Sequence, residues 1–206
     1  MGRVEERRAR VTDAIVAAAT EVMAEGGAAS LSLGEVARRM RMRTPSLYGY
    51  FGSRGELCDE IFRRGWDGYG RLSAVTVTAD TDFPDLLRRA LLESVTWANE
   101  HRAAAELMFW RPIPHWQPSA AAFGPAIAAM DNLVRVVAEA QAAGHVRDDV
   151  AADEVAQVLA TLTVGVIGQQ LANEPGVPAG QGRASRHAAS FASMFLKEYG
   201  TTRRTT

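Results

Sequence analysis

Hydrophobic residues recur at intervals of three and four along most of the chain, which is the spacing of one face of an α-helix. The first series runs from Val11 to Val22, and Gly26 and Gly27 after it are typical of a helix stop. Similar series predict further helices at residues 82–99, 102–110, 119–143, 151–173 and 184–199. Asp82 and Ser119 are the N-cap candidates of two of these helices. No segment alternates between polar and apolar residues over a convincing length for a strand. The pattern predicts an all-α protein.

The two ends of the chain lack this pattern. Residues 1–8 are highly charged and are expected to form a loose arm, either a frayed terminus or a basic arm that reaches the minor groove of DNA. Glu5 and Glu6 dilute the positive charge of this arm. The tail at residues 201–206 is expected to be disordered.

A short stretch in the first third of the chain carries three helix starts. Ser32, with Glu35 three residues later, has the pattern of a capping box. Thr44 is a second N-cap candidate, and Pro45 suits the first turn of a helix because its missing N–H costs nothing there. Ser53 opens a third helix with another capping box. Helices this short, joined by tight corners, indicate a helix-turn-helix.

The charges in this stretch point the same way. All charged residues between positions 36 and 54 are arginines: Arg38, Arg39, Arg41, Arg43 and Arg54. The whole chain has a formal charge of -1, so this positive charge is local. A basic surface on a compact helical motif favours phosphate binding, and the alternative is a merely solvated arginine-rich face.

The segment from about Arg8 to Phe62 resembles the DNA-binding domain of the TetR family of transcriptional regulators. The resemblance is carried by the apolar face of the first helix and by residues 30–33, 44–51 and 54–57. It implies a three-helix helix-turn-helix domain at residues 1–62, with a linking helix from 53 to about 72. It also implies a larger C-terminal helical domain at residues 73–206 for ligand binding and dimerisation.

The resemblance also implies DNA contacts. The second helix of such a motif lies in the major groove. The implied base readers are Arg43, Thr44, Pro45, Ser46, Gly49 and Tyr50. The implied phosphate contacts are Tyr48, Arg54 and Ser32, the last at the start of the first helix of the motif. Leu47 and Phe51 are expected in the core.

Two residues depart from the family pattern. Arg41 stands in the turn where relatives usually have glycine, so either the turn is altered or Arg41 adopts a strained or left-handed conformation. Gly49 replaces a usually large side chain, which shortens the reach of the helix at that position.

Aromatic and sulfur-containing residues concentrate between positions 97 and 130. The resemblance implies a ligand cavity in this helical domain, and aromatic walls with a few polar groups suit one. The candidate ligand-binding residues are Trp97, His101, Met108, Trp110, Trp116, Phe123 and Gln169. Few charges lie among them, so the expected ligand is apolar or aromatic. The alternative is that these residues only pack the core.

The last two predicted helices are rich in small residues, and Gly165 and Gly168 would let another helix approach closely. The resemblance implies that two such helices from each subunit form a four-helix dimer interface. A two-fold dimer would bind a palindromic operator. The alternative is that these helices only complete the core of one chain.

Other classes of function find little support in the residues. There is no phosphate-binding loop, no His-Glu-x-x-His motif and no nucleophile elbow, and the four histidines lack metal-ligand spacing. The single cysteine fits a reducing compartment, and no signal peptide or membrane span is expected, so the prediction is a cytoplasmic protein. No enzyme activity, cofactor or metal is predicted.

The leading hypothesis is a homodimeric repressor of transcription, released from its operator by a small molecule. A second hypothesis is a DNA-binding regulator that has no small-molecule ligand. A third is a helical ligand-binding protein or enzyme that has lost DNA binding.

Overall fold

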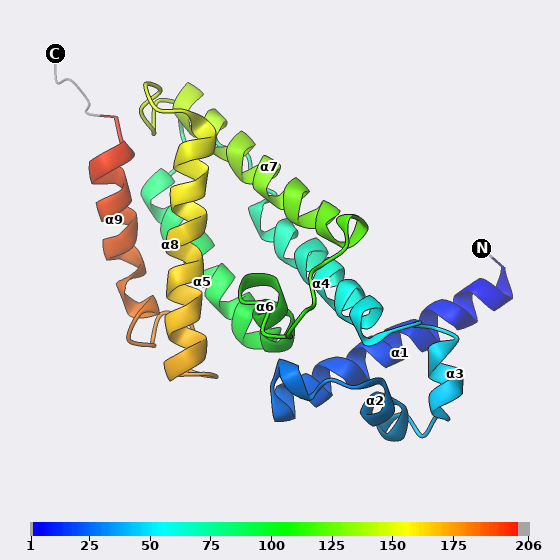
Figure 1. The fold of residues 1–206 in the computed structure, drawn as a ribbon. Helices are drawn as coiled ribbons and strands as arrows, with labels where there is room; N and C mark the ends of the chain where they lie inside the picture. Colours follow the sequence, from blue (N-terminus) through cyan, green and yellow to red (C-terminus); the bar gives the residue numbers. More distant parts are fainter. Residues whose placement is uncertain (1, 202–206) are drawn as a thin grey trace, which may run out of the picture. The chain divides into compact units, whose positions relative to one another are not determined.

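A computed structural model describes residues 2–201 of the chain, all of whose regular elements are helical (Figure 1). The α-helices are α1 Arg3–Gly26, α2 Leu33–Arg39, α3 Thr44–Tyr48, α4 Arg54–Gly70, α5 Phe83–Glu100, α6 Arg102–Phe109, α7 Ala120–Ala142, α8 Ala152–Asn173 and α9 Ala188–Tyr199. Short 3-10 turns are η1 Ala28–Ser30, η2 Arg71–Ser73 and η3 Ser185–His187. In residues 2–201 the only β pairing is an isolated bridge between Val146 and Gly200, which confirms the all-α prediction. The predicted disordered tail falls almost wholly outside these residues.

Capping residues and glycines in the sequence correctly predicted several helix ends. The Asp82 carboxylate accepts a hydrogen bond from the Asp85 amide at 3.1 Å, so it caps α5 as predicted. The Ser119 hydroxyl accepts from the Ala122 amide at 3.3 Å and caps α7. Gly27 and Gly144 follow α1 and α7 with φ of 78° and 77°, a conformation in which a side chain would be strained.

The loose arm predicted for residues 1–8 is wrong, because α1 already begins at Arg3. The Gly2 amide donates to the Glu5 carboxylate at 2.9 Å, and Glu5 and Glu6 place negative charge in the first turn. Negative charge is favourable at a helix N-terminus. The acids that seemed to dilute a basic arm therefore stabilise a helix.

The last helix starts at Ala188, four residues later than predicted. The Ser185 hydroxyl donates to the buried Gln170 side chain at 2.9 Å and accepts from the Gly180 amide at 3.0 Å. These bonds hold the preceding segment as a loop ending in a 3-10 turn.

The chain divides into two compact units. The first unit comprises Met1–Trp66 and His101–Gly124, and the second comprises Asp67–Glu100 and Pro125–Thr206. Residues of α4 and of α7 therefore occur in both units. The proposed functional division between residues 1–62 and 73–206 stays a prediction.

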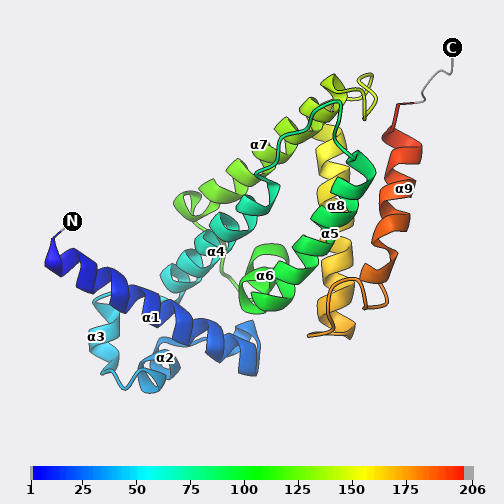
Figure 2. The ribbon, with the colours of Figure 1, turned by 180° about the vertical axis from the view of Figure 1, so that it is seen from behind.

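In the first unit, α1 packs against α2 and α6 (Figure 2). Its core consists of large apolar side chains that are almost completely shielded from solvent, among them Ile15, Val36, Leu47, Leu57 and Phe62. Burial of such side chains stabilises a small helical domain by roughly 1.5–3 kcal/mol each. This core fixes the orientation of α2 and α3.

In the second unit, α5 packs against both α8 and α9 (Figure 2). A buried cluster joins these helices to α7 and to the segment before α5. Its members are Val77, Phe83, Val136, Val137, Ala140, Val146, Val155, Ala156 and Phe195.

Two helices of the described chain are long and apolar enough to cross a membrane by length and composition, which the sequence did not lead us to expect. They are α7 and α8, with mean hydropathy of 1.3 and 1.4 over their most apolar windows. The core helix of a soluble protein passes the same test. Only 17% and 33% of these windows are buried within the chain, so much apolar helix surface is left exposed.

Candidate nucleic-acid interface

At the start of α2, one of the two hydrogen bonds of the predicted capping box forms. The Ser32 hydroxyl accepts a hydrogen bond from the Glu35 amide at 3.1 Å. The Glu35 carboxylate does not return to Ser32 but binds Arg38 through two hydrogen bonds of 2.9 and 2.6 Å. The hydrogen bond from Arg38 lowers the pKa of Glu35 below its ordinary value. Glu35 therefore neutralises one of the arginines expected to bind phosphate.

The turn between α2 and α3 confirms the left-handed alternative for Arg41, whose φ is 54°. The Met42 amide donates to the Ala37 carbonyl at 2.9 Å, and the Arg41 amide donates to the Arg38 carbonyl at 3.1 Å. These two bonds form a Schellman motif, in which a glycine usually occupies the position of Arg41. The turn thus keeps its ordinary geometry, and Arg41 carries the strain.

The N-cap of α3 is Arg43 rather than Thr44. The Ser46 and Leu47 amides both donate to the Arg43 carbonyl, at 2.9 and 3.3 Å, so the helix begins one residue earlier than predicted. Pro45 then stands at the second helical position. Its missing N–H still costs nothing there, because the first amides of a helix have no partner within the helix.

The structure separates the buried from the exposed residues around α3. Leu47 and Phe51 are buried, as predicted. Tyr48 is 52% exposed. The other candidate DNA contacts in this region are exposed or half-buried: Arg43, Pro45, Ser46 and Gly49 are exposed, and Thr44 and Tyr50 are half-buried. The structure therefore brings all of these candidates together on or beside one short helix.

The carboxyl end of α3 is held by a residue that the sequence analysis missed. Arg8 of α1 donates from Nη2 to the Gly49 carbonyl at 3.0 Å, and its guanidinium lies 5.1 Å from the centre of the Tyr50 ring. A signal for Arg8 was present, since it precedes the buried Ile15 by seven residues and so lies on the same helix face. It was overlooked because residues 1–8 were expected not to be helical.

At the start of α4, the Ser53 hydroxyl accepts from the Glu56 amide at 3.1 Å, as a cap should. Arg54, a candidate phosphate contact, is half-buried. Its Nη2 donates to the Ala29 carbonyl at 3.2 Å, and its buried Nε has no hydrogen-bond partner within residues 2–201. Part of the guanidinium is therefore used inside the unit, and the phosphate contact stays a prediction.

The acid-free run of arginines is divided once the chain folds. Arg38 pairs with Glu35, and Arg39 pairs with Glu25 at 2.5 Å, an acid from α1 far away in the sequence. Arg41 and Arg43 are exposed and form no ion pair with any described residue. The uncompensated positive charge thus concentrates at the turn and at the start of α3.

The amino-terminal turns of α1 carry further positive charge. Arg3, Arg7 and Arg10 are exposed and lie at helical spacing on one face. None of the three is ion-paired within the described part of the chain. A surface of this kind attracts a polyanion, because the positive charges are not neutralised by neighbouring acids.

Several candidate ligand residues of the first unit form a packed aromatic cluster on α4. The Phe62 ring lies 5.8 Å from Trp116 and 5.9 Å from Phe123, and the Trp116 Nε1 donates to Asp59 at 3.0 Å. Met108 is buried against Gly65, where an added Cβ would lie 2.6 Å from its sulfur. These side chains fill the interior of the unit.

The other two candidates of the first unit lie nearer the surface. Trp110 follows α6 and packs against the Phe109 ring, with centroids 5.7 Å apart, yet remains exposed. His101 is the exposed N-cap residue of α6.

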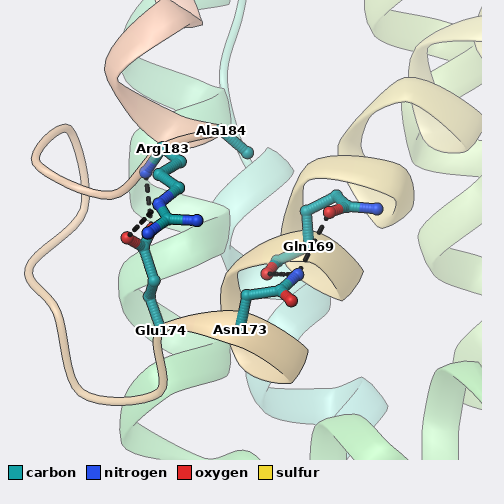
Figure 3. Close-up of a pocket in the computed structure, with 5 residues that line it drawn as sticks. All are labelled: Gln169, Asn173, Glu174, Arg183 and Ala184. Carbon is teal, nitrogen blue, oxygen red and sulfur yellow. Dashed lines mark hydrogen bonds and ion pairs between the residues drawn. The ribbon is translucent and has the colours of Figure 1, made fainter.

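In the second unit, Trp97 is buried and its ring lies 5.2 Å from Tyr69. Gln169 is exposed and lines a small depression together with Asn173, Glu174, Arg183 and Ala184 (Figure 3). The lining is polar, unlike the aromatic walls expected for a cavity. The Glu174 carboxylate is already bonded to the Arg183 amide at 2.6 Å.

The polar side chain that α8 buries is Gln170, not the neighbouring Gln169. Its amide group donates to the Glu174 and Val177 carbonyls at 3.2 and 2.9 Å, so it fastens the loop that follows α8. The spacing of three and four from the buried Ile167 and Val166 could have indicated this face. Gln170 has a structural role.

No group of three or more His, Cys, Asp or Glu side chains in residues 2–201 is placed to hold a metal ion. Burial raises the pKa of the Cys58 thiol to about 11, so this cysteine stays protonated at neutral pH. A buried, protonated thiol is a poor nucleophile. Cys58 packs in the core of the first unit.

Comparison with known proteins adds to this geometry. Residues 15–61 match the family model described as bacterial regulatory proteins, tetR family. No curated protein matches the sequence.

Many solved structures share the fold. The protein SCO4313, assigned a regulatory role, is 25% identical, with a TM-score of 0.70 over 96% of this chain and 98% of that one. A tetR-family regulatory protein from Rhodococcus RHA1 is 21% identical, with a TM-score of 0.67 over 93% and 97% of the two chains. SmeT, the repressor of a multidrug efflux pump of Stenotrophomonas maltophilia, is 20% identical, with a TM-score of 0.67 over 93% and 91%. These likenesses extend through both units of the chain.

Proposed function

Because this chain belongs to the TetR family of DNA-binding transcriptional regulators, we propose that it is a homodimeric repressor that a small molecule releases from a palindromic operator. Members of this family are transcription factors and not enzymes. The observation that carries the proposal is the exposed surface around α3, where Arg41 and Arg43 form no ion pair with any described residue and where the buried Leu47 and Phe51 hold the helix in place.

The exposed side of α3 has the chemistry required to read a major groove. The Ser46 and Thr44 hydroxyls can donate to or accept from base edges, and the methyl of Thr44 can contact thymine. Arg43 reads a base edge beside them. Tyr48 and Arg54 contact phosphates around the groove, and these contacts set the position of the helix on the duplex. Ser32 orients the start of α2 beside the backbone, and Pro45, Gly49 and Tyr50 complete the reading surface.

The dimer is supported by the apolar surface that α8 and α9 leave uncovered. Leu162 is 39% exposed and Met194 is 56% exposed, although both are large apolar side chains. Gly165 on α8 is exposed too, with open space around its Cα where another helix could approach. A second copy related by a two-fold axis covers such a face with the same face of its own. The two α3 helices then lie about 34–36 Å apart, one turn of DNA.

The proposed effector is a small apolar or aromatic molecule. Its support is the family resemblance together with the aromatic and weakly charged character of the candidates in each unit, Trp116 and Phe123 in the first and Trp97 in the second. Binding releases the operator if the molecule prefers a dimer in which the two α3 helices have the wrong spacing. A few kcal/mol of preference is sufficient.

One observation favours a second candidate, a regulator without a small-molecule ligand. Trp97, Met108 and Trp116 are all nearly fully buried against protein neighbours, as in an ordinary core. In that case the second unit serves pairing alone.

A mobility-shift experiment tests the proposal. The protein is incubated with the duplex upstream of its own coding region, and the salt concentration is raised stepwise. We expect a shift that weakens steeply with salt, because phosphate contacts release counterions. Apolar aromatic compounds that quench tryptophan fluorescence should abolish the shift, and their failure to do so favours the second candidate. A protein that is monomeric and does not bind this duplex at low salt contradicts the proposal.

A further inference from the structure

Helix α3 has only five residues, so it cannot hold its own carboxyl end in place. The last carbonyls of any helix lack partners within the helix and need donors from elsewhere. After α3 the Tyr50 and Phe51 amides both return to the Leu47 carbonyl, at 2.9 and 3.1 Å. The Gly49 carbonyl is left for a partner outside the motif, and that partner is Arg8 of α1.

Arg8 makes two contacts with this end of α3. Its Nη2 donates to the Gly49 carbonyl at 3.0 Å, and the guanidinium stacks 5.1 Å from the centre of the Tyr50 ring. A cation at a helix carboxyl end is favoured by the helix dipole, and a guanidinium over an aromatic ring adds a cation–π attraction. Both contacts act on residues that are themselves proposed base readers, Gly49 and Tyr50.

We propose that Arg8 is a positioning residue for DNA reading, which locks the carboxyl end of α3 in the orientation that discriminates between base sequences. The inference rests on the proposed function. It assigns a role to a side chain of α1 that lies 41 positions from its partner, outside the helix-turn-helix. Arg8 acts through Gly49 and Tyr50 and need not touch a base itself.

The chain offers a matched control in Arg7. It is exposed on the same helix turn, and its side chain forms no hydrogen bond or ion pair with any described residue. Arg7→Gln and Arg8→Gln therefore remove the same charge from the same end of α1. Only Arg8→Gln also removes the contacts with α3.

The first measurement uses a duplex selected by the wild-type protein from a random library, and a scrambled duplex of equal length. Dissociation constants for both are measured at one fixed salt concentration. We expect Arg8→Gln to lower the preference for the selected duplex roughly tenfold. Arg7→Gln should change both constants by the same factor. Arg8→Lys keeps the charge but not the planar stacking group, so its preference should fall as well.

Two results would overturn the proposal. One is an Arg8→Gln variant whose two constants change by the same factor, as in Arg7→Gln. The other is an Arg8→Lys variant with the preference of the wild type, which would reduce Arg8 to a simple positive charge.

The second measurement needs no DNA. Amide hydrogen exchange at Tyr50 and Phe51 should be faster in Arg8→Gln and Arg8→Lys than in Arg7→Gln, because the end of α3 opens more often. Equal exchange in the three variants contradicts the proposal. If the wild type selects no duplex, the proposed function fails, whereas this measurement still decides whether Arg8 positions α3. Should Arg8→Gln not fold, Arg8→Lys carries both measurements.

Discussion

The arginines of the two units differ in whether acidic side chains neutralise their charge. In the second unit, most described arginines are ion-paired: Arg88 and Arg89 with Asp85, Arg135 with Glu139, Arg147 with Asp149 and Arg183 with Glu174. In the first unit, Arg41 and Arg43 at α3 form no ion pair among the described residues. A paired arginine contributes little field beyond its neighbourhood, whereas an unpaired one attracts a polyanion. The contrast shows which part of the surface suits DNA.

The apolar surface shows the opposite distribution. On α8 and α9 of the second unit, Leu162 and Met194 remain exposed, while the α3 region buries Leu47 and exposes polar atoms. Exposed large apolar side chains on helices of small residues favour another protein surface. Each unit thus leaves a different kind of surface without a partner, one suited to phosphate and the other to a second copy.

The largest expected effect comes from placing charge on the exposed face of α8 and α9. The double variant Leu162→Asp, Met194→Asp should sediment as a monomer, because paired carboxylates cannot be buried at a two-fold interface. Operator affinity should fall about 100-fold or more, since the two reading helices are no longer linked. Ile127→Asp, a change at a similarly exposed residue of α7, serves as the control and should remain dimeric. A double variant that still sediments as a dimer would disprove this interface.

The next effect compares two neighbouring residues of α3. Leu47→Ala should lower the free energy of unfolding by about 2–5 kcal/mol, because it leaves a cavity in the core of the first unit. Tyr48→Ala removes an exposed ring, so its effect on stability should stay within about 0.5 kcal/mol. Denaturant titrations followed by circular dichroism measure both.

DNA binding, unlike stability, should depend on Tyr48. If Tyr48 contacts phosphate, Tyr48→Ala weakens the binding of all duplexes alike, as measured by fluorescence anisotropy. Unchanged binding by Tyr48→Ala would remove this residue from the interface.

A smaller effect is expected on the salt dependence of DNA binding, when an unpaired arginine and a paired one are each replaced. Arg43→Gln should reduce the slope of log K against log salt by up to about 0.9, because one uncompensated positive charge is lost from the surface that faces the duplex. Arg89, which is paired with Asp85 at 2.8 Å, is the control, and Arg89→Gln should leave the slope unchanged. Equal slopes in the two variants would mean that ion pairing does not distinguish the two surfaces.

The smallest effect concerns the strained turn. Arg41→Gly should raise the free energy of unfolding by about 1 kcal/mol, because glycine adopts the observed φ of 54° without strain. Arg41→Ala keeps a Cβ and should leave stability nearly unchanged. If Arg41→Gly proves no more stable than Arg41→Ala in urea unfolding, the left-handed conformation costs less than we infer.

Pairing of charges explains why part of the interface could be predicted from sequence and part could not. The acid-free run of arginines was correct as a local observation. It did not reveal that Glu25 of α1 neutralises Arg39, because the two residues meet only when α1 packs against α2. The same limit applies to the aromatic candidates, whose identity as chemical groups was clear but whose packing partners were not.

By itself, the sequence determined the all-α class and the caps at Ser32, Asp82 and Ser119, and it limited the turn at Arg41 to two alternatives, of which the left-handed one is observed. These features depend on hydrogen bonds between residues a few positions apart, whose geometry local chemistry fixes. Only the tertiary structure decided that Arg8 holds the end of α3 and that Gln170, not Gln169, is buried. Such contacts depend on which helix faces meet, and that is settled by the packing of the whole core.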